Sequence, residues 1–423
     1  MRCNSIYDGC DRYGQGLDCD HQILKILHVS PYFMPARAYG GRVESLYRLC
    51  LNLARLGCEV RVLATNGDGP GKVLEVQTGR QIAVAAGFEV TYLGRLARHA
   101  VAPGLLVRLP FEMRRADLVH LSGVYSFPTI PTLLLCRLLR KPLAWSPRGD
   151  LLRWQGTRGR IAKRTWEIAC RIAAPRATML QLASDKEYNA SLSRFPKFGA
   201  TVIPNAIRLP ANIKHTAGDG TLRLGYIGRL HEKKGLDNLL EACRILKIRD
   251  VAFSLVIAGS GRARYTRALI RRIAKLELNN VVRMVGQVNG AAKREFFESI
   301  DLLVTPSHGE SFATSVTEAL AHAVPVIASR GTPWSRLAEK GCGLWVDNAP
   351  ASLADAIAQI NTMPLEEMGL RGREWMAAEF SWDAAARAVC NAYAVMIRGK
   401  PALDDMARTN SSLAAAGEAT PRN

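Results

Sequence analysis

Two glutamates eight positions apart, Glu310 and Glu318, are the residues whose types and spacing are best suited to chemistry. Their carboxylates can accept hydrogen bonds from the hydroxyl pairs of a sugar. Glu318 falls within an apolar helical pattern, where an unpaired carboxylate would be costly, and the N–H groups near residues 312–315 open that helix and suit a phosphate. Apolar runs at 301–304 and 325–328 flank the stretch, which predicts a ligand site at the carboxyl end of a parallel sheet.

Two basic residues, Arg229 and Lys234, form a second candidate group. They follow a buried strand at 222–228 and precede a helix expected at 236–246. Two fixed cations beside a helix N-terminus suit a diphosphate. A ligand with a diphosphate and two sets of hydroxyls is a nucleoside-diphosphate sugar. Paired carboxylates are also typical of glycoside hydrolases, but a neutral glycan needs no cations, which makes hydrolysis less attractive.

A glycine pair, Gly40 and Gly41, lies between a strand at 24–29 and a helix that runs from Arg42 to Gly57. The glycines allow close backbone approach, and the helix N-terminus can face an anion. The spacing is not GxGxxG, so a dinucleotide site is disfavoured. A plain turn is an equally good interpretation of this pair alone.

Strands and helices alternate along the chain, which predicts two parallel, doubly wound α/β domains with a binding cleft between them. The expected strands are residues 24–29, 59–65, 89–93, 118–121, 143–146, 179–183, 201–203, 222–228, 253–258, 282–285, 302–304, 326–328 and 344–346. The expected segments are a flexible extension over 1–22, a first domain over 23–207, a linker over 208–221, a second domain over 222–380 and a disordered tail over 400–423.

The formal net charge is +20, of which about +15 lies in residues 1–210. A basic half implies an anionic partner such as phosphate, nucleic acid or an anionic membrane surface, although solubility alone also accounts for it. Nucleic acid is disfavoured because no recognition motif is present. The basic helix expected at 158–176 is amphipathic, which fits a membrane surface and its own sheet equally well.

No apolar run reaches the roughly 18 residues that a membrane-spanning helix needs, and no secretory signal is visible. The ten cysteines have neither zinc nor disulfide spacing. We therefore expect a cytoplasmic protein, with peripheral association at the inner face of the cytoplasmic membrane as a further expectation.

Taken together, these motifs resemble the retaining GT-B glycosyltransferases of family four, the glycosyl transferases group 1. Glu310-x7-Glu318 matches the EX7E element of that family, and Gly228-Arg229-Leu230…Lys234-Gly235 matches its GR(L/F)…KG element. Gly286-Gln287-Val288 stands between them, as in the family. The resemblance covers roughly residues 24–398, and it implies a GT-B fold of two Rossmann-like domains that face each other across a cleft.

The resemblance implies a catalytic group of Arg229, Lys234 and Glu310. The two cations would hold the donor diphosphate and stabilise the leaving group, while Glu310 would contact the transferred sugar. Glu318 would contact the ribose of the nucleotide. Gly228 would open the cation loop within the donor site.

The same resemblance assigns supporting roles to backbone segments. The backbone at Phe312 and Ala313 would support the phosphates, and the segment that ends at Val288 would line the base pocket. Gly40-Gly41 would face phosphate and acceptor. The helix at about 381–398 would cross back onto the first domain.

The chain departs from the commoner family pattern at two places. Many relatives have Glu-Gly-Phe-Gly where this chain has Glu-Ser-Phe-Ala at 310–313, a change that small residues should tolerate. Many also have a His where this chain has Arg148, in a Pro-Arg-Gly segment similar to that of bacterial exopolysaccharide and O-antigen transferases. We expect Arg148 to bind a phosphate of donor or acceptor, or alternatively to pair with Asp150 or another acid.

The expected function is transfer of a sugar from a nucleoside-diphosphate sugar to a glycan or lipid-linked acceptor in cell-surface polysaccharide biosynthesis, with retention of configuration. No metal or other cofactor is expected, because the two cations can neutralise the departing diphosphate. Two alternatives stay open: a nucleotide-sugar epimerase, and a non-catalytic protein that binds nucleotide sugars or glycans.

Overall fold

A computed structural model describes residues 23–69, 71–153, 159–213 and 220–398. The predicted extension 1–22 and tail 400–423 lie outside the described residues, as does part of the predicted linker. Within the described ranges, no helix has both the length and the apolar character needed to cross a membrane.

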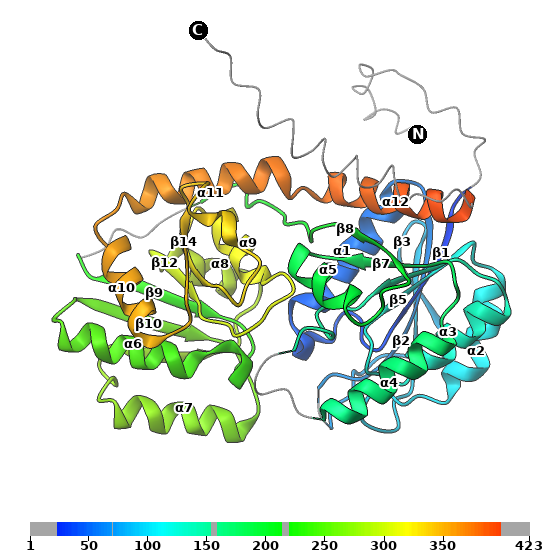
Figure 1. Cartoon of the computed structure of the whole chain (residues 1–423), viewed down its shortest axis with the longest axis horizontal. Coiled ribbons are helices and arrows are strands. Elements are labelled where there is room, and N and C mark those ends of the chain that lie inside the picture. Colours follow the sequence, from blue (N-terminus) through cyan, green and yellow to red (C-terminus); the bar gives the residue numbers. More distant parts are fainter. Residues whose placement is uncertain (1–22, 70, 154–158, 214–219, 399–423) are drawn as a thin grey trace, which may run out of the picture.

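The first half of the chain forms an eight-stranded sheet (Figure 1). Its order is β3-β4-β2-β1-β5-β6-β7-β8, and its strands are parallel except that β3 runs antiparallel to β4 at the edge. The strands are β1 (Lys25–Ser30), β2 (Glu59–Thr65), β3 (Gln81–Ala85), β4 (Phe88–Leu93), β5 (Leu118–Ser122), β6 (Leu143–Ser146), β7 (Thr178–Leu182) and β8 (Gly199–Val202).

The second half forms a parallel six-stranded sheet in the order β11-β10-β9-β12-β13-β14. Its strands are β9 (Leu222–Ile227), β10 (Phe253–Ala258), β11 (Val282–Gly286), β12 (Leu302–Thr305), β13 (Val326–Ser329) and β14 (Gly343–Val346). The predicted pair of doubly wound α/β sheets is confirmed. The edge strand β3 was not predicted, because its residues are mostly exposed and give no apolar run.

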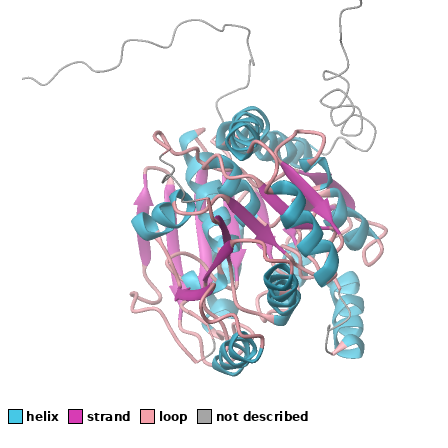
Figure 2. Ribbon diagram, turned by 90° about the vertical axis from the view of Figure 1, so that its left-hand side faces the viewer, coloured by secondary structure: helices cyan, strands magenta, loops and turns pink. Residues whose placement is uncertain are grey.

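Helices cover both faces of the two sheets (Figures 1 and 2). Those of the first half are α1 (Gly41–Arg55), α2 (Gly104–Arg114), α3 (Thr129–Leu138), α4 (Arg160–Ala173) and α5 (Asp185–Leu192). Those after it are α6 (Leu236–Ile248), α7 (Ala263–Lys275), α8 (Gly290–Glu298), α9 (Thr314–Ala321), α10 (Pro350–Ile360), α11 (Leu365–Glu379) and α12 (Trp382–Arg398).

Strand β1 shows why these strands read as nearly continuous apolar runs. Ile26 packs into the core shared with α1 and α12, whereas Leu27 and Val29 pack into the core shared with α2, α3 and α4. Because helices bury both faces of a parallel sheet, successive side chains along a strand are mostly apolar. The same burial makes the carboxyl ends of the strands the natural place for polar loops.

Helix α12 lies on the first half although it follows the second half in the chain (Figure 1). Its buried Tyr393 makes a hydrogen bond through its hydroxyl to Nδ1 of His120 on β5, and Nε2 of His120 lies 2.8 Å from Oγ of Ser146 on β6. The ring of His28 on β1 lies beside that of His120, with the ring centroids 4.6 Å apart and the planes tilted by 30°. Burial, together with the charge of Arg148, lowers the pKa of His28 to about 3, so this core histidine is neutral at pH 7.

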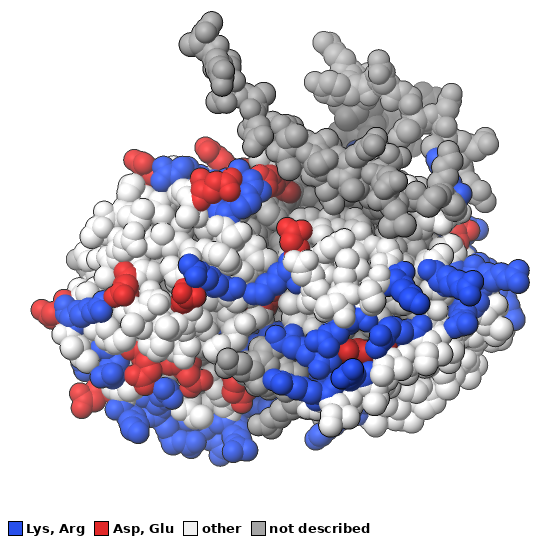
Figure 3. Space-filling model, in the orientation of Figure 1, with Lys and Arg blue, Asp and Glu red and all other residues white. Residues whose placement is uncertain are grey.

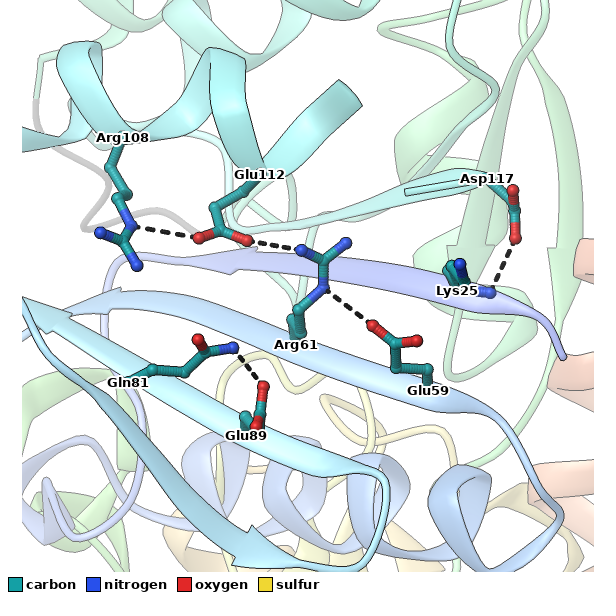
Figure 4. A network of polar contacts seen from close by, with 8 residues as sticks. All are labelled: Lys25, Glu59, Arg61, Gln81, Glu89, Arg108, Glu112 and Asp117. Atoms are coloured by element: carbon teal, nitrogen blue, oxygen red, sulfur yellow. Dashed lines mark hydrogen bonds and ion pairs between the residues drawn. The ribbon is translucent and has the colours of Figure 1, made fainter. Parts of the chain in front are cut away.

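A buried ion pair fixes α2 to the same sheet (Figure 4). Nη1 of Arg61 on β2 lies 2.7 Å from Oε2 of Glu112 on α2, and both residues are 5% exposed. Arg108 donates to the other oxygen of Glu112 at 3.1 Å, and Glu59 lies 3.5 Å from Nε of Arg61. The carboxylate of Glu112 therefore compensates a guanidinium that the sheet has removed from water.

Candidate functional site

Two loops at the carboxyl edge of the second sheet carry most of the predicted site residues. One follows β9 and contains Arg229 and Lys234, and the other follows β12 and contains Glu310. Strands β9 and β12 are parallel neighbours, paired through Leu224 and Leu302. Their loops therefore emerge side by side, as the sequence predicts for a site at the carboxyl ends of parallel strands.

Lys234 and Glu310 meet between these loops. The Nζ atom of Lys234 lies 2.5 Å from the Oε1 atom of Glu310, and the side chains are 22% and 15% exposed. Gly235 makes this approach feasible: its φ is +69°, and a Cβ atom there would lie 1.9 Å from the carbonyl oxygen of Pro306. A glycine is needed at this position on both counts.

A third cation, Lys233, was not singled out in the sequence. Burial lowers the pKa of Lys233 to about 8, against the opposing effect of Glu310. The pKa of Glu310 would rise through burial, but Lys234 and then Lys233 outweigh this and hold it below its usual value. Although Arg229 is exposed at the surface, the partial removal of its guanidinium from water lowers its pKa. The positive charge of Arg42 lowers it further. We call Arg229, Lys233 and Lys234 the cation group.

Glu318 also has a cationic partner that was missed in the sequence. Nζ of Lys293 on α8 lies 2.5 Å from Oε1 of Glu318 on α9, with side chains 34% and 17% exposed. Helix α8 begins just after Val288, which is half-buried and packs against the core around α9. The position of Lys293 on the helix that follows Gly286-Gln287-Val288 is the signal that would have identified it.

The N-termini of α1 and α9 lie next to each other. A Cβ atom on Gly41 would lie 2.9 Å from Oγ1 of Thr314, the first residue of α9. Gly40 and Ala313 precede the two helices with φ of +68° and +60°. The first N–H groups of a helix have no acceptor within it, so two positive helix ends converge here.

Phe312 fixes the entry into α9. Its side chain is buried and packs on Trp334, whose Nε1 donates to the carbonyl oxygen of Phe312 at 2.5 Å. Gly228, at the other loop, lies so close to Gly259 that a Cβ atom on Gly259 would meet its carbonyl oxygen at 1.8 Å. Both loops are therefore held rigidly at the sheet edge.

The two halves touch at a junction beside Glu310. Oγ of Ser184 donates to the carbonyl oxygen of Ser311 at 2.6 Å, and Nζ of Lys186 donates to that of Gly331 at 2.7 Å. A Cβ atom on Gly149 would lie 2.8 Å from Oγ of Ser311. Ser311, where the chain departs from the commoner family pattern, is thus a contact between the halves.

Arg148 lies apart from the cation group. Its Nη1 atom is 3.4 Å from Oγ of Ser45 and from Oδ1 of Asn205, both in the first half. The alternative was a pairing of Arg148 with Asp150 or another acid. Asp150 pairs with Arg42 at 2.9 Å instead. Burial lowers the pKa of Arg148, and the charge of Glu187 opposes this shift. A phosphate role for Arg148 stays a prediction.

Two family models match the two halves of the chain. The model described as Glycosyltransferase Family 4 matches residues 39–209, and that described as Glycosyl transferases group 1 matches residues 212–375. Together they include every predicted site residue.

Curated relatives match most strongly over part of their length. A D-inositol 3-phosphate glycosyltransferase of Pseudarthrobacter chlorophenolicus is 31% identical over 46% of this chain and 47% of the relative. The putative colanic acid biosynthesis glycosyltransferase WcaL of Salmonella typhimurium is 30% identical over 39% of this chain and 43% of the relative. The matches thus span somewhat less than half of these two relatives. A D-inositol 3-phosphate glycosyltransferase of Corynebacterium diphtheriae is 26% identical over 93% of this chain and 97% of its own length.

Solved structures share the fold over almost the whole chain. A sucrose-phosphate synthase from Thermosynechococcus elongatus has a TM-score of 0.69 at 18% identity, covering 89% of this chain and all of that one. Anabaena HepE in complex with UDP-glucose has a TM-score of 0.67 at 18% identity, covering 88% of this chain and 99% of that one. With a family 4 model over its first half and a group 1 model over its second, the chain belongs to the GT-B glycosyltransferases of the family 4 type.

Proposed function

We propose that this chain is a retaining glycosyltransferase that moves a sugar from a nucleoside-diphosphate sugar to a glycan or lipid-linked acceptor in cell-surface polysaccharide biosynthesis. The observation that carries the proposal is the Lys234–Glu310 pair, 2.5 Å apart and next to the start of α9. It combines cations for a diphosphate with a carboxylate for sugar hydroxyls in one place. HepE, which has the same fold, is described in complex with UDP-glucose.

In this proposal the donor diphosphate lies against the cation group and the N-termini of α1 and α9. Charge accumulates on the diphosphate as it departs, and fixed cations and helix ends stabilise that charge without having to reorganise. The cation group takes the part that a divalent metal takes in other transferases, so the reaction proceeds without one. Glu318, held by Lys293, accepts hydrogen bonds from the ribose hydroxyls.

The transfer step needs no carboxylate nucleophile. The bond between the anomeric carbon and the diphosphate oxygen breaks, and the acceptor hydroxyl oxygen bonds to the same face of that carbon. The hydroxyl proton passes to the departing diphosphate. Glu310 orients the sugar through its hydroxyls, and contact of the halves at Ser311 excludes the water that would otherwise hydrolyse the donor.

The acceptor side belongs to the first half, which is the more basic part of the chain. We propose that it meets a lipid-linked or polysaccharide acceptor at the inner face of the cytoplasmic membrane, as a peripheral protein. One similar relative is described as a putative colanic acid biosynthesis glycosyltransferase, which is in line with a cell-surface polysaccharide.

The test begins with thermal stability in the presence of nucleotides and nucleotide sugars, because a bound donor raises stability by mass action. The donor that stabilises the protein is then incubated with lipid-linked acceptors, with and without a metal chelator. We expect transfer that the chelator does not reduce, and NMR of the product should show that the anomeric configuration is retained.

Each other outcome contradicts the proposal in its own way. A sugar nucleotide converted without any acceptor would indicate an epimerase. Donor binding without turnover on any acceptor would indicate a binding protein. Transfer with inversion of configuration, or transfer abolished by the chelator, would overturn the mechanism.

A further inference from the structure

A cavity of about 550 Å³ lies in the first half, and none of its lining residues belongs to the cation group. Its lining comes from α4, from Arg153, and from Ser193 and Arg194. Its charged lining consists of one glutamate, Glu167, and five arginines: Arg153, Arg160, Arg164, Arg171 and Arg194. We call these five residues the arginine pocket. In Figure 3 basic side chains gather over the area where Figure 1 shows α4.

The carboxylate of Glu167 is already engaged. It is buried, it accepts a hydrogen bond from the Tyr125 hydroxyl, and its Oε1 lies 2.5 Å from Nη2 of Arg153. Arg194 lies 4.0 Å from its other oxygen. The buried Nε atoms of Arg153 and Arg194 have no hydrogen-bond partner within the described residues. Unpaired buried cationic donors are costly, so the pocket is arranged for an additional anion.

The exposed face of α4 indicates where that anion comes from. Ile161, Ile168 and Ile172 are 83%, 42% and 67% exposed, and their spacing places them in one stripe along the helix. Arg164 and Arg171 fall in the adjoining row. An apolar stripe beside a basic row is typical of a helix that lies in the surface of a bilayer. The anion is therefore expected at a membrane surface rather than free in solution.

The number of arginines favours a diphosphate over a single phosphodiester. Arginine forks bind phosphate oxygens in pairs of hydrogen bonds, and among the described residues that line the cavity there are five arginines and one acid, Glu167. A lipid-linked diphosphate carries more charge than an ordinary anionic phospholipid and gives these forks more oxygens to bind.

The pocket is also close to the junction. Gly149, which contacts Ser311, is four residues before Arg153 on the same loop. Four residues span at most about 14 Å. A diphosphate held in the pocket would leave its attached sugar within reach of the donor side.

We propose that the arginine pocket binds the diphosphate of a lipid-linked acceptor while the isoleucine stripe of α4 lies in the bilayer surface. This inference rests on the proposed function for the identity of the acceptor. It adds the site that recognises the acceptor's diphosphate.

The test is vesicle co-sedimentation of the full chain without any sugar nucleotide. One set of phosphatidylcholine vesicles contains undecaprenyl diphosphate, and the other contains phosphatidylglycerol at the same total charge. We expect the first set to bind at least about tenfold more tightly, as expected for one or two charge-assisted hydrogen bonds. Equal binding to both sets would overturn the proposal in favour of a general anionic surface.

The variant Arg164→Gln/Arg171→Gln should remove this preference. Both side chains are exposed, neither makes a hydrogen bond or ion pair within the described residues, and glutamine suits a helix, so the fold should survive. The matched control is Arg267→Gln/Arg271→Gln, which removes the same charge from exposed positions on α7. Equal binding by the two variants would also overturn the proposal.

The result is independent of catalysis. Preferential binding without sugar transfer would refute the proposed function but leave the arginine pocket standing. Transfer to a soluble acceptor without preferential binding would refute the pocket alone.

Discussion

Nζ of Lys234 lies 2.5 Å from Oε1 of Glu310, although 76 residues separate them in the chain. Each side chain neutralises the other while both are largely removed from water. A bound donor would take over both roles, with its diphosphate on the lysine and its sugar on the carboxylate. The pair thus holds two reactive groups in position before the donor arrives, which lowers the cost of ordering them on binding.

Replacing Lys234 by Ala should lower kcat by about 10²–10³-fold, the cost typical of losing one fixed donor to a developing negative charge. Steady-state kinetics with saturating donor measure this effect. The control is Lys275→Ala, which removes an exposed lysine from α7. Full activity in the Lys234 variant would show that Lys234 is not a catalytic residue.

Lys233 should make donor binding depend on pH. Its pKa is lowered to about 8, so its positive charge is lost as the pH rises through that value. A diphosphate binds the protonated form better, and donor affinity should therefore fall between pH 7 and pH 9. Calorimetric titrations across this range provide the measurement. The variant Lys233→Gln should bind more weakly at pH 7 and lose the pH dependence attributed to this lysine; an unchanged profile would contradict the assignment.

Lys293 should act on donor recognition rather than on bond breaking. Without it, Glu318 loses the ammonium group at 2.5 Å, and in the proposed donor complex the ribose hydroxyls would lose a carboxylate held in a fixed position. In Lys293→Ala we expect KM for the donor to rise about tenfold with a small change in kcat, as for binding uniform to ground and transition states. The preference for ribose over 2′-deoxyribose donors should weaken in parallel. An equal loss for both donors would point to a structural role instead.

Gly41→Ala should impair catalysis without unfolding the protein. The added methyl group would lie 2.9 Å from Oγ1 and 3.2 Å from Cβ of Thr314, so Thr314 at the start of α9 must shift. A small misplacement at a reaction centre costs up to about 10²-fold in rate, while alanine itself favours a helix. Activity and melting temperature are compared with those of Gly199→Ala, where a Cβ atom meets nothing within 4 Å. Similar kinetics in the two variants would show that the approach of the helices is unimportant.

Glu112→Ala should destabilise the first half strongly. It leaves Arg61 buried without its main carboxylate, and breaking a buried pair costs about 3–5 kcal/mol. Glu44→Ala removes a partner of Arg48, and in this pair the side chains are 37% exposed for Arg48 and 45% exposed for Glu44, so the change should cost at most about 1 kcal/mol. Urea denaturation distinguishes the two. The double variant Arg61→Met/Glu112→Leu should recover much of the lost free energy of unfolding. If the double variant is no more stable than Glu112→Ala, the unpaired charge of Arg61 is not the cause of the destabilisation.

Much of the fold follows from local pattern. The strands of parallel sheets appear as apolar runs because both faces are covered, and twelve strands were predicted close to their observed positions. The predicted start of β8, at residue 201, lies two residues after the observed start at Gly199. Strand β3 was missed because Gln81–Ala85 lies at an edge, is mostly exposed and depends on pairing with β4. Helix α2 was not assigned because Pro110 interrupts its apolar pattern.

The candidate site was predictable where chemistry and spacing coincide. Arg229, Lys234, Glu310 and Glu318 stand out by type and by their place after strands. Lys293 did not, because its contact with Glu318 joins two helices whose relative placement is a tertiary property. The pairing of Asp150 with Arg42 rather than with the nearby Arg148 is equally invisible in sequence, since it depends on how the loop after β6 turns.

The return of α12 to the first sheet has a consequence for biosynthesis on the ribosome. Val389 and Tyr393 complete the core around β1 and α1, yet they are translated only after the whole second half. During synthesis the first half therefore lacks the apolar residues of α12 until the whole second half has been translated. The core of the first half is completed last, although its strands are made first.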